Sequence, residues 1–340
     1  MKNNILRFKK DGSFRILMVS DFHAGRNCSH KLIDGLEALL DNTSPDLVLL
    51  GGDQILDVST VDEAREYMTR IMEPVIRRGL PWAAVFGNHD REVGIPVEEE
   101  EKAYEQIPGC LSEAGPEDIH GTGNYRLDIF DSEGKKKLFH IYALDSFTST
   151  ADYVRLFGLD KDTRFILPDS FANKNDQATP MFDQVMWYFN DSKNCEAEEG
   201  RKIPAILYMH VPCMEFCLVE RNPEQTDARG SKREKVGCSE MNSGLFFACL
   251  QRGDVKGIFC GHDHLIDFAG KYCGITLAYD AALGYNMSAH DDLRGGRVID
   301  LRDDGTFETR AVKLIDIMGK DAMRDPDYFE GGCKYFFRDL

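Results

Sequence analysis

The sequence predicts an α/β fold in which at least part of a β-sheet is parallel. The first observation is that short apolar runs alternate with segments whose apolar residues recur at helical spacing. Alternating strands and helices of this kind place consecutive strands parallel in one sheet. The second observation is that several apolar runs end in dense polar clusters. α/β proteins place their chemistry at such strand ends.

Five predicted strands end in side chains that can bind metal. The apolar runs cover residues 15–20, 46–50, 81–86, 205–209 and 256–260. They lead, in the same order, into Asp21-Phe22-His23, Gly51-Gly52-Asp53, Gly87-Asn88-His89-Asp90, His210 and Gly261-His262-Asp263-His264. One such coincidence is common in any sequence, but five in one chain are hard to obtain by chance.

The other elements follow from local patterns. Apolar spacing predicts helices at 30–42, 61–78, 98–107, 180–190 and 243–252. Strands are predicted at 1–8, which turns at Asp11-Gly12 into the next strand, at 125–131 and 137–144 as a hairpin, and at 274–280, 296–301 and 307–314 as a late antiparallel group. The acidic run Glu98 to Glu101 is expected to form the solvated start of its helix.

Two long polar insertions interrupt this order, at 146–179 and 213–240. Long loops on a rigid scaffold usually carry function, so we expect both insertions to wall a pocket and to select its ligand. The tail from 320 to 340 has no clear pattern. With neither an internal repeat nor a linker, we expect residues 1–340 to form a single domain.

Charge, apolar runs and cysteine pattern limit which binding partners and which cellular compartment we expect for this protein. The net charge is −17 with no basic stripe, which disfavours nucleic acid and anionic membranes as partners. No apolar run approaches the ~20 residues that span a bilayer, and the N-terminus lacks a signal-peptide core. The ten cysteines form no Cys-x-x-Cys pair, which favours reduced thiols in a cytoplasmic protein. No partner protein is evident.

The polar side chains at the strand ends form a donor set for metal. They are two carboxylates, four imidazoles and one amide oxygen: Asp21, Asp53, His23, His210, His262, His264 and Asn88. This is too many donors for one ion and about right for two, if one ligand bridges. A nitrogen and oxygen set without thiolate suits Mn, Fe or Zn better than Mg or Ca.

The five motifs, in this order, resemble those of the calcineurin-like metallophosphoesterase family. The resemblance covers most of residues 12–301, and all five motifs are intact. Residues 242–246 and 253–257 resemble the branch of bacterial, yeast and plant proteins related to purple acid phosphatases. The resemblance implies a four-layer α-β-β-α sandwich, with two mixed sheets packed face to face and helices outside.

The resemblance also implies how the ligands are shared. One ion would be held by Asp21, His23, Asp53 and His264, and a second by Asp53, Asn88, His210 and His262. Asp53 would bridge the two. The implied activity is hydrolysis of a phosphate-ester substrate by a hydroxide that bridges the two metal ions.

Four further residues are candidates for roles in the reaction. By resemblance His89 assists the leaving-group oxygen, and Asp90 holds the His89 ring. A carboxylate commonly orients a histidine in this way. Arg26 and Arg91 follow ligand motifs and are candidates to bind a substrate oxyanion, although a surface salt bridge explains them equally well.

Two departures from the related proteins leave the substrate open. Leu56 stands where purple acid phosphatases carry the tyrosine of their coloured centre, so we expect no purple centre. Tyr279-Asp280-Ala281 stands where relatives often read Tyr-Gly-Arg. The alternatives are a phosphodiesterase acting on a nucleotide or lipid head-group diester, an inactive metal-binding scaffold, and a metal-dependent amide hydrolase, which usually shows His-x-His after an early strand.

Overall fold

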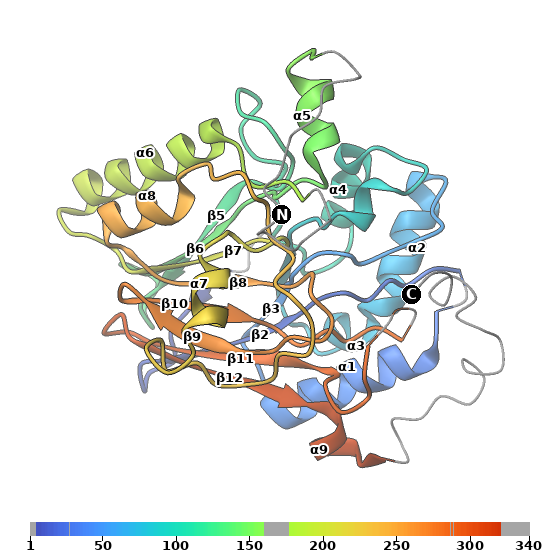
Figure 1. The fold of residues 1–340 in the computed structure, drawn as a ribbon. Helices are drawn as coiled ribbons and strands as arrows, with labels where there is room; N and C mark the ends of the chain where they lie inside the picture. The colour runs from blue at the N-terminus through green and yellow to red at the C-terminus, as the bar shows by residue number, and fades with distance from the viewer. Residues whose placement is uncertain (1–4, 27, 160–176, 286, 288, 321–340) are drawn as a thin grey trace.

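The protein is an α/β sandwich of two mixed sheets with helices on both outer sides (Figure 1). The computed structural model describes residues 5–26, 28–159, 177–285, 287 and 289–320. The fold predicted from the sequence is therefore confirmed. None of the helices formed by these residues has the length and apolar content to cross a bilayer.

The larger sheet has seven strands within the described residues, in the order β1-β5-β6-β7-β8-β10-β9. Its strands are β1 (Leu6–Arg7), β5 (Tyr125–Phe130), β6 (Lys137–Ala143), β7 (Ala205–Tyr208), β8 (Val255–Cys260), β9 (Ala269–Tyr272) and β10 (Ile275–Tyr279). Strands β6, β7, β8 and β10 run parallel, so the ends of β7 and β8 lie at the same edge.

The smaller sheet has five strands in the same part of the chain, in the order β12-β11-β2-β3-β4. Its strands are β2 (Ser13–Val19), β3 (Leu47–Leu50), β4 (Trp82–Ala84), β11 (Gly295–Arg302) and β12 (Phe307–Lys313). Strands β2, β3 and β4 are parallel. Strand β11 pairs antiparallel with both β2 and β12.

Helices cover the outer face of each sheet. Apolar residues of α1 (His30–Thr43), α2 (Val61–Ile71), α3 (Glu73–Ile76) and α4 (Val97–Glu105) pack on the smaller sheet. Those of α6 (Phe182–Glu199), α7 (Phe216–Arg221) and α8 (Leu245–Arg252) pack on the larger sheet. The shorter helices are η1 (His89–Arg91), α5 (Thr150–Leu156) and α9 (Leu314–Met318).

Three buried clusters fill the spaces between the four layers. The alternation of side chains along β2 shows how one strand serves two of them. Leu17 and Val19 point into the cluster under α1 to α4, whereas Ile16 and Met18 point into the cluster between the sheets. Because both faces of these strands are buried, the sequence reads as continuous apolar runs.

The structure corrects three expectations about individual elements. The predicted helix 61–78 is broken into α2 and α3 at Met72, two residues before Pro74, because proline has no N–H to continue the helix. Strand β1 pairs with β5 and not with β2, so the turn near Gly12 connects the two sheets. The late strands also divide: β10 pairs parallel with β8 and antiparallel with β9, which was not predicted.

The acidic run at the start of α4 is not fully exposed to solvent, contrary to the expectation from the sequence. Glu98 and Glu99 lie near the surface, but Glu100 and Glu101 are fully buried. Tyr104 donates a hydrogen bond of 2.5 Å to Glu100 Oε1, while Oε2 of Glu100 has no hydrogen-bond partner. Burial, reinforced by the nearby carboxylate of Asp90, raises the pKa of Glu100 well above its usual value.

We expect Glu100→Gln to stabilise the protein at pH 8 more than at pH 5. Folded Glu100 keeps its proton above pH 4.5, where the unfolded chain has lost it, so the wild type loses stability as the pH rises. The penalty is about 1.4 kcal/mol for each unit between the two pKa values. Glutamine keeps an acceptor for Tyr104 without titrating. Urea unfolding at both pH values measures the effect, and an equal change at both would contradict it.

Candidate metal centre

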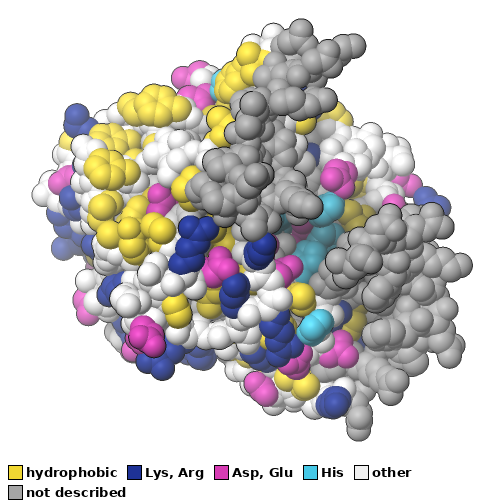
Figure 2. All heavy atoms as spheres, viewed as in Figure 1, with side chains coloured by type: hydrophobic (Ala, Val, Ile, Leu, Met, Phe, Trp, Pro, Cys, Tyr) yellow, Lys and Arg dark blue, Asp and Glu magenta, His cyan; other side chains and the backbone are white. Residues whose placement is uncertain are grey.

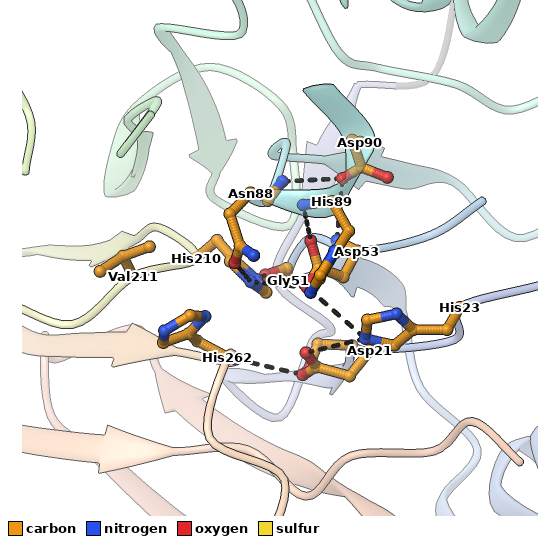
Figure 3. A network of polar contacts seen from close by, with 12 residues as sticks. Asp21, His23, Gly51, Asp53, Asn88, His89, Asp90, His210, Val211 and His262 are labelled. Carbon is orange, nitrogen blue, oxygen red and sulfur yellow. Dashed lines mark hydrogen bonds and ion pairs between the residues drawn. The ribbon is translucent and has the colours of Figure 1, made fainter. Parts of the chain in front are cut away.

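The structure brings together all seven side chains of the predicted donor set. They arrive from the carboxyl ends of β2, β3 and β4 in the smaller sheet and of β7 and β8 in the larger one. Figure 3 shows the side chains of Asp21, His23, Asp53, Asn88, His210 and His262 lying close together, and in Figure 2 histidine side chains reach the surface. The predicted convergence at strand ends therefore describes the geometry of this site.

The first group of donors consists of Asp21, His23, Asp53 and His264. One atom from each of the four lies within 4.8 Å of the others. His23 Nε2 is 3.5 Å from Asp53 Oδ2, and His264 Nε2 is 3.4 Å from Asp21 Oδ1. Three of the four side chains are buried and His264 is half-buried, so water solvates them little.

The second group consists of Asp53, His210 and His262, with Asn88 beside them. His210 Nε2 lies 3.1 Å from Asp53 Oδ2 and 3.2 Å from Asn88 Oδ1. The other ring nitrogen, Nδ1, lies 2.7 Å from the carbonyl of Gly51. A carbonyl only accepts hydrogen bonds, so Nδ1 carries the proton and Nε2 can offer its lone pair to a metal.

The buried carboxylates supply the test of whether these residues fit metal ions. Asp21 Oδ1 and Asp53 Oδ2 are buried and have no hydrogen-bond partner. Charged oxygens in such a place cost free energy unless a cation compensates them. Both lie within 3.5 Å of histidine nitrogens that belong to the two donor groups. The residues therefore fit two cations, with Asp53 facing both groups.

The backbone at the ligands is held in an uncommon conformation. Asp21, His23, Asp53 and His262 all have positive φ, at 55°, 44°, 54° and 79°. Residues other than glycine seldom adopt this region, and they retain it only where the surrounding structure enforces it. Its recurrence at four donors indicates that the fold bends each strand exit to aim a side chain at the centre.

Gly52 is needed for close approach of the two sheets at the site. Its φ is +104°, and a Cβ there would lie 2.3 Å from His210 Nδ1. We therefore expect Gly52→Ala to displace His210 and lower the metal content measured by elemental analysis. Gly79→Ala is the matched control, because Gly79 also has positive φ but meets nothing within 4 Å. It should cost only the backbone strain of about 1–2 kcal/mol. Equal metal content in both variants would contradict the prediction.

Asp90 does not hold the His89 ring, so that expectation is wrong. Its buried carboxylate accepts hydrogen bonds from four backbone N–H groups: those of Asp53, Gln54 and Gly87 at 2.8, 2.8 and 2.7 Å, and that of Ile55 at 3.4 Å. Burial, together with the charge of Asp53, raises the pKa of Asp90 to about 6, against the effect of these hydrogen bonds. Asp90 thus fixes the backbone of the ligand shared by both donor groups.

The His89 ring is held by Glu92, which the sequence reasoning missed. Glu92 Oε2 lies 2.7 Å from His89 Nδ1. The three-residue spacing on a helical turn was the signal that would have found it. The backbone N–H of His89 donates to Asp53 Oδ1 at 2.8 Å, and its ring lies 5.0 Å from that of His23. His89 is therefore at the centre without being part of either donor group.

The two candidate arginines both make ion pairs within the fold. Arg26 is largely exposed and contacts Glu63 and the hydroxyl of Tyr67. Arg91 is mostly buried, pairs with Asp145 and lies 5.1 Å over the Phe147 ring. The contacts of Arg26 match the surface salt bridge given as the alternative, whereas the ion pair of Arg91 lies in the interior.

Both predicted insertions contact the ligand loops. Thr148 Oγ1, in the first insertion, donates to the carbonyl of Asn88 at 3.4 Å. Gly237, in the second, packs against His262: a Cβ at Gly237 would lie 3.0 Å from the ring. Residues 160–176 of the first insertion and 321–340 of the tail lie outside the described residues.

The fold and the donor set define an α/β sandwich with two adjoining groups of side chains that could each hold a metal ion. The family model for calcineurin-like phosphoesterases matches residues 14–265, so the chain belongs to this family. The resemblance inferred from the motifs is therefore confirmed.

The curated relatives place the chain near the purple acid phosphatases of plants. It is 32% identical to "Probable inactive purple acid phosphatase 14" of Arabidopsis thaliana, over 83% of this chain and 73% of the relative. It is 28% identical to "Probable inactive purple acid phosphatase 29" of the same plant, over 83% and 74%. "Phosphatase DCR2" of Saccharomyces cerevisiae is 24% identical over 76% of this chain and 45% of the yeast protein.

Solved structures agree on the fold. A dimetal phosphatase from Danio rerio aligns with a TM-score of 0.53 at 12% identity, covering 87% of this chain and 98% of that one. GAP50 of Plasmodium aligns with a TM-score of 0.51 at 12% identity, covering 90% and 86%. At this identity the similarity establishes the shared fold alone.

Proposed function

We propose that this chain is an active phosphoesterase that hydrolyses phosphate esters with two divalent metal ions, Mn, Fe or Zn. The observation that carries the proposal is the complete donor set around Asp21 Oδ1 and Asp53 Oδ2, two buried oxygens without hydrogen-bond partners. When bound, the two ions would supply a nucleophilic hydroxide at neutral pH and neutralise charge on the phosphoryl oxygens.

The chain's own residues would divide the remaining work. Asp21, His23 and His264 would hold one ion, Asn88, His210 and His262 the other, and Asp53 would hold both. The hydrogen bond from His210 Nδ1 to the carbonyl of Gly51 fixes the ring, and so fixes the direction of the lone pair on Nε2 that would bind the metal. His89 would face the leaving group, with Glu92 orienting the ring through Nδ1.

The charge balance of the site supports a phosphate ligand. Two divalent ions bring four positive charges, and the carboxylates of Asp21 and Asp53 remove two. The remaining positive charge attracts an anion even in a chain of net charge −17. Because several relatives are named probable inactive, the intact donor set is the feature that favours activity in this chain.

The experiment is a metal add-back screen. Metal-stripped protein would be supplied with Mn²⁺, Fe²⁺, Zn²⁺ or Mg²⁺ and assayed on phosphomonoesters and phosphodiesters. We expect activity with a transition metal, and the ratio of the two ester classes decides between phosphatase and phosphodiesterase. Metal uptake without turnover of either class would favour the inactive scaffold. Uptake of less than two ions per chain would contradict the dinuclear centre.

A further inference from the structure

A group of buried cysteines lies beside the metal centre and takes no part in it. Five thiols belong to the core cluster between the larger sheet and its helices: Cys213, Cys217, Cys238, Cys249 and Cys260. Within this group Cys217 and Cys238 form a contact pair, with their Sγ atoms 3.4 Å apart.

We propose that Cys217 and Cys238 are a redox-reactive thiol pair. On oxidation they form a reversible disulfide that weakens metal binding at the neighbouring candidate metal centre. The oxidant would be hydrogen peroxide. The Cys217 thiolate attacks one peroxide oxygen, the O–O bond breaks, and Cys217 becomes a sulfenic acid. The hydroxide that leaves takes up the proton that the thiol had lost and becomes water. The Cys238 thiol then attacks that sulfur, and a second water leaves. In total, two thiols and one hydrogen peroxide are converted into one disulfide and two water molecules.

The geometry requires only a small movement. A disulfide has an S–S distance of about 2.05 Å, so the sulfurs must approach each other by roughly 1.4 Å. Cys217 lies in α7, and Cys238 lies in the second insertion, 21 residues further along the chain. Their exposed fractions of 8% and 5% admit a small oxidant more readily than a bulky one.

The two thiols are also chemically unequal. The hydrogen bond from Cys238 lowers the pKa of Cys217, against the effect of burial, and the same contact raises the pKa of Cys238. The thiolate is the form that attacks peroxide. This asymmetry makes Cys217 the first thiol to be oxidised and Cys238 the one that resolves it.

The segment that carries Cys238 contacts the loop of residues 261–264, which contains the donors His262 and His264. The N–H of Gly237 donates to Asp263 Oδ2 at 2.8 Å, and the Tyr279 hydroxyl donates to the same oxygen at 2.5 Å. Asp263 lies between the donors His262 and His264 in the sequence. Gly237 also faces the His262 ring, where a Cβ would come within 3.0 Å of Nε2.

Closing the disulfide would draw Cys238 towards α7 and displace the neighbouring Gly237 from its present contacts with Asp263 and His262. Loss of such supporting contacts lowers metal affinity by roughly 10- to 100-fold. Oxidation should therefore weaken metal binding in the half-site that contains His262. This second step rests on the metal centre proposed above, whereas formation of the disulfide does not.

The first experiment maps the disulfide in the full chain. Reduced protein is treated with hydrogen peroxide, digested without reductant and examined by mass spectrometry. We expect a Cys217–Cys238 linked peptide that dithiothreitol reverses. The link should be lost in Cys217→Ser and in Cys238→Ser, and kept in Cys273→Ser, which removes an exposed thiol. Absence of the linked peptide from the oxidised wild type, or a link from Cys238 to Cys213 in its place, would overturn the proposal.

The second experiment tests the coupling by Mn²⁺ titration, because thiolates bind Mn²⁺ poorly. Free Mn²⁺ is measured by electron paramagnetic resonance. Oxidised wild type should bind the ion roughly 10-fold more weakly than the reduced form at one site, and peroxide-treated Cys217→Ser should not. Equal affinities of both wild-type forms would overturn the coupling. Failure of both forms to bind Mn²⁺ would overturn the proposed coupling, while the disulfide would stand and the add-back screen with Fe²⁺ and Zn²⁺ would decide the metal centre separately.

Discussion

Asp53→Asn should lower turnover by roughly 10³-fold or more, which is the loss expected when several kcal/mol of charge stabilisation disappear. Asp53 Oδ2 lies 3.5 Å from His23 Nε2 and 3.1 Å from His210 Nε2, so one oxygen faces both donor groups. Replacing the carboxylate by an amide removes the one negative charge that both ions would share. Saturating metal should not restore the rate.

Asn88→Ala is the matched comparison because Asn88 is neutral and approaches only the second group. Its Oδ1 lies 3.2 Å from His210 Nε2. We expect a loss of roughly 10- to 100-fold in metal affinity, which added metal partly recovers. Steady-state rates across a metal titration, with metal content measured in parallel, separate the two variants. Comparable residual rates at saturating metal would exclude a bridging role for Asp53.

The donor set was predictable because two local signals coincide in it. A buried strand followed by a glycine marks the sheet edge, and a metal-capable side chain directly after it marks the site. Asp53, Asn88 and His262 show both signals, whereas His210 shows only the second, since it follows β7 with no glycine before it and no longer motif around it. Each signal is local in the sequence, so no knowledge of the tertiary structure was needed.

Features that depend on tertiary contacts were not predictable in the same way. The pattern of residues 274–280 indicates a strand, but pairing with β8 in place of β11 depends on which sheet is nearby. The burial of Glu100 depends on what packs over α4. Local rules place an acidic first turn in solvent. They contain no information about a neighbouring layer.

The roles of Asp90 and Glu92 show the same limit inside the site. A carboxylate next to a histidine in sequence is a natural partner for its ring. The turn at η1, however, directs Asp90 to the backbone N–H groups of residues 53, 54, 55 and 87 and leaves the ring to Glu92. Four N–H donors converging on one buried carboxylate outweigh a single exposed imidazole.

His89→Asn should cost far more on an alkyl phosphate ester than on an activated aryl ester. An alkoxide is a poor leaving group unless it is protonated, whereas an activated phenolate leaves readily without a proton. A positioned general acid typically contributes ~10²–10⁴ in rate, and we expect a loss in this range for the alkyl ester alone. Metal content should stay unchanged, because the contact from residue 89 to Asp53 is made by the backbone N–H.

Glu92→Gln is a milder variant that tests whether His89 acts as the general acid. It keeps an acceptor for Nδ1 of His89 but removes the charge, so its loss should be smaller and have the same dependence on the leaving group. Rates for a series of esters with increasing leaving-group pKa measure both variants on one scale. A steeper dependence on leaving-group pKa in His89→Asn than in wild type identifies His89 as the proton donor. Parallel dependences would mean that His89 orients the phosphate instead, because an orienting contact aids every ester alike.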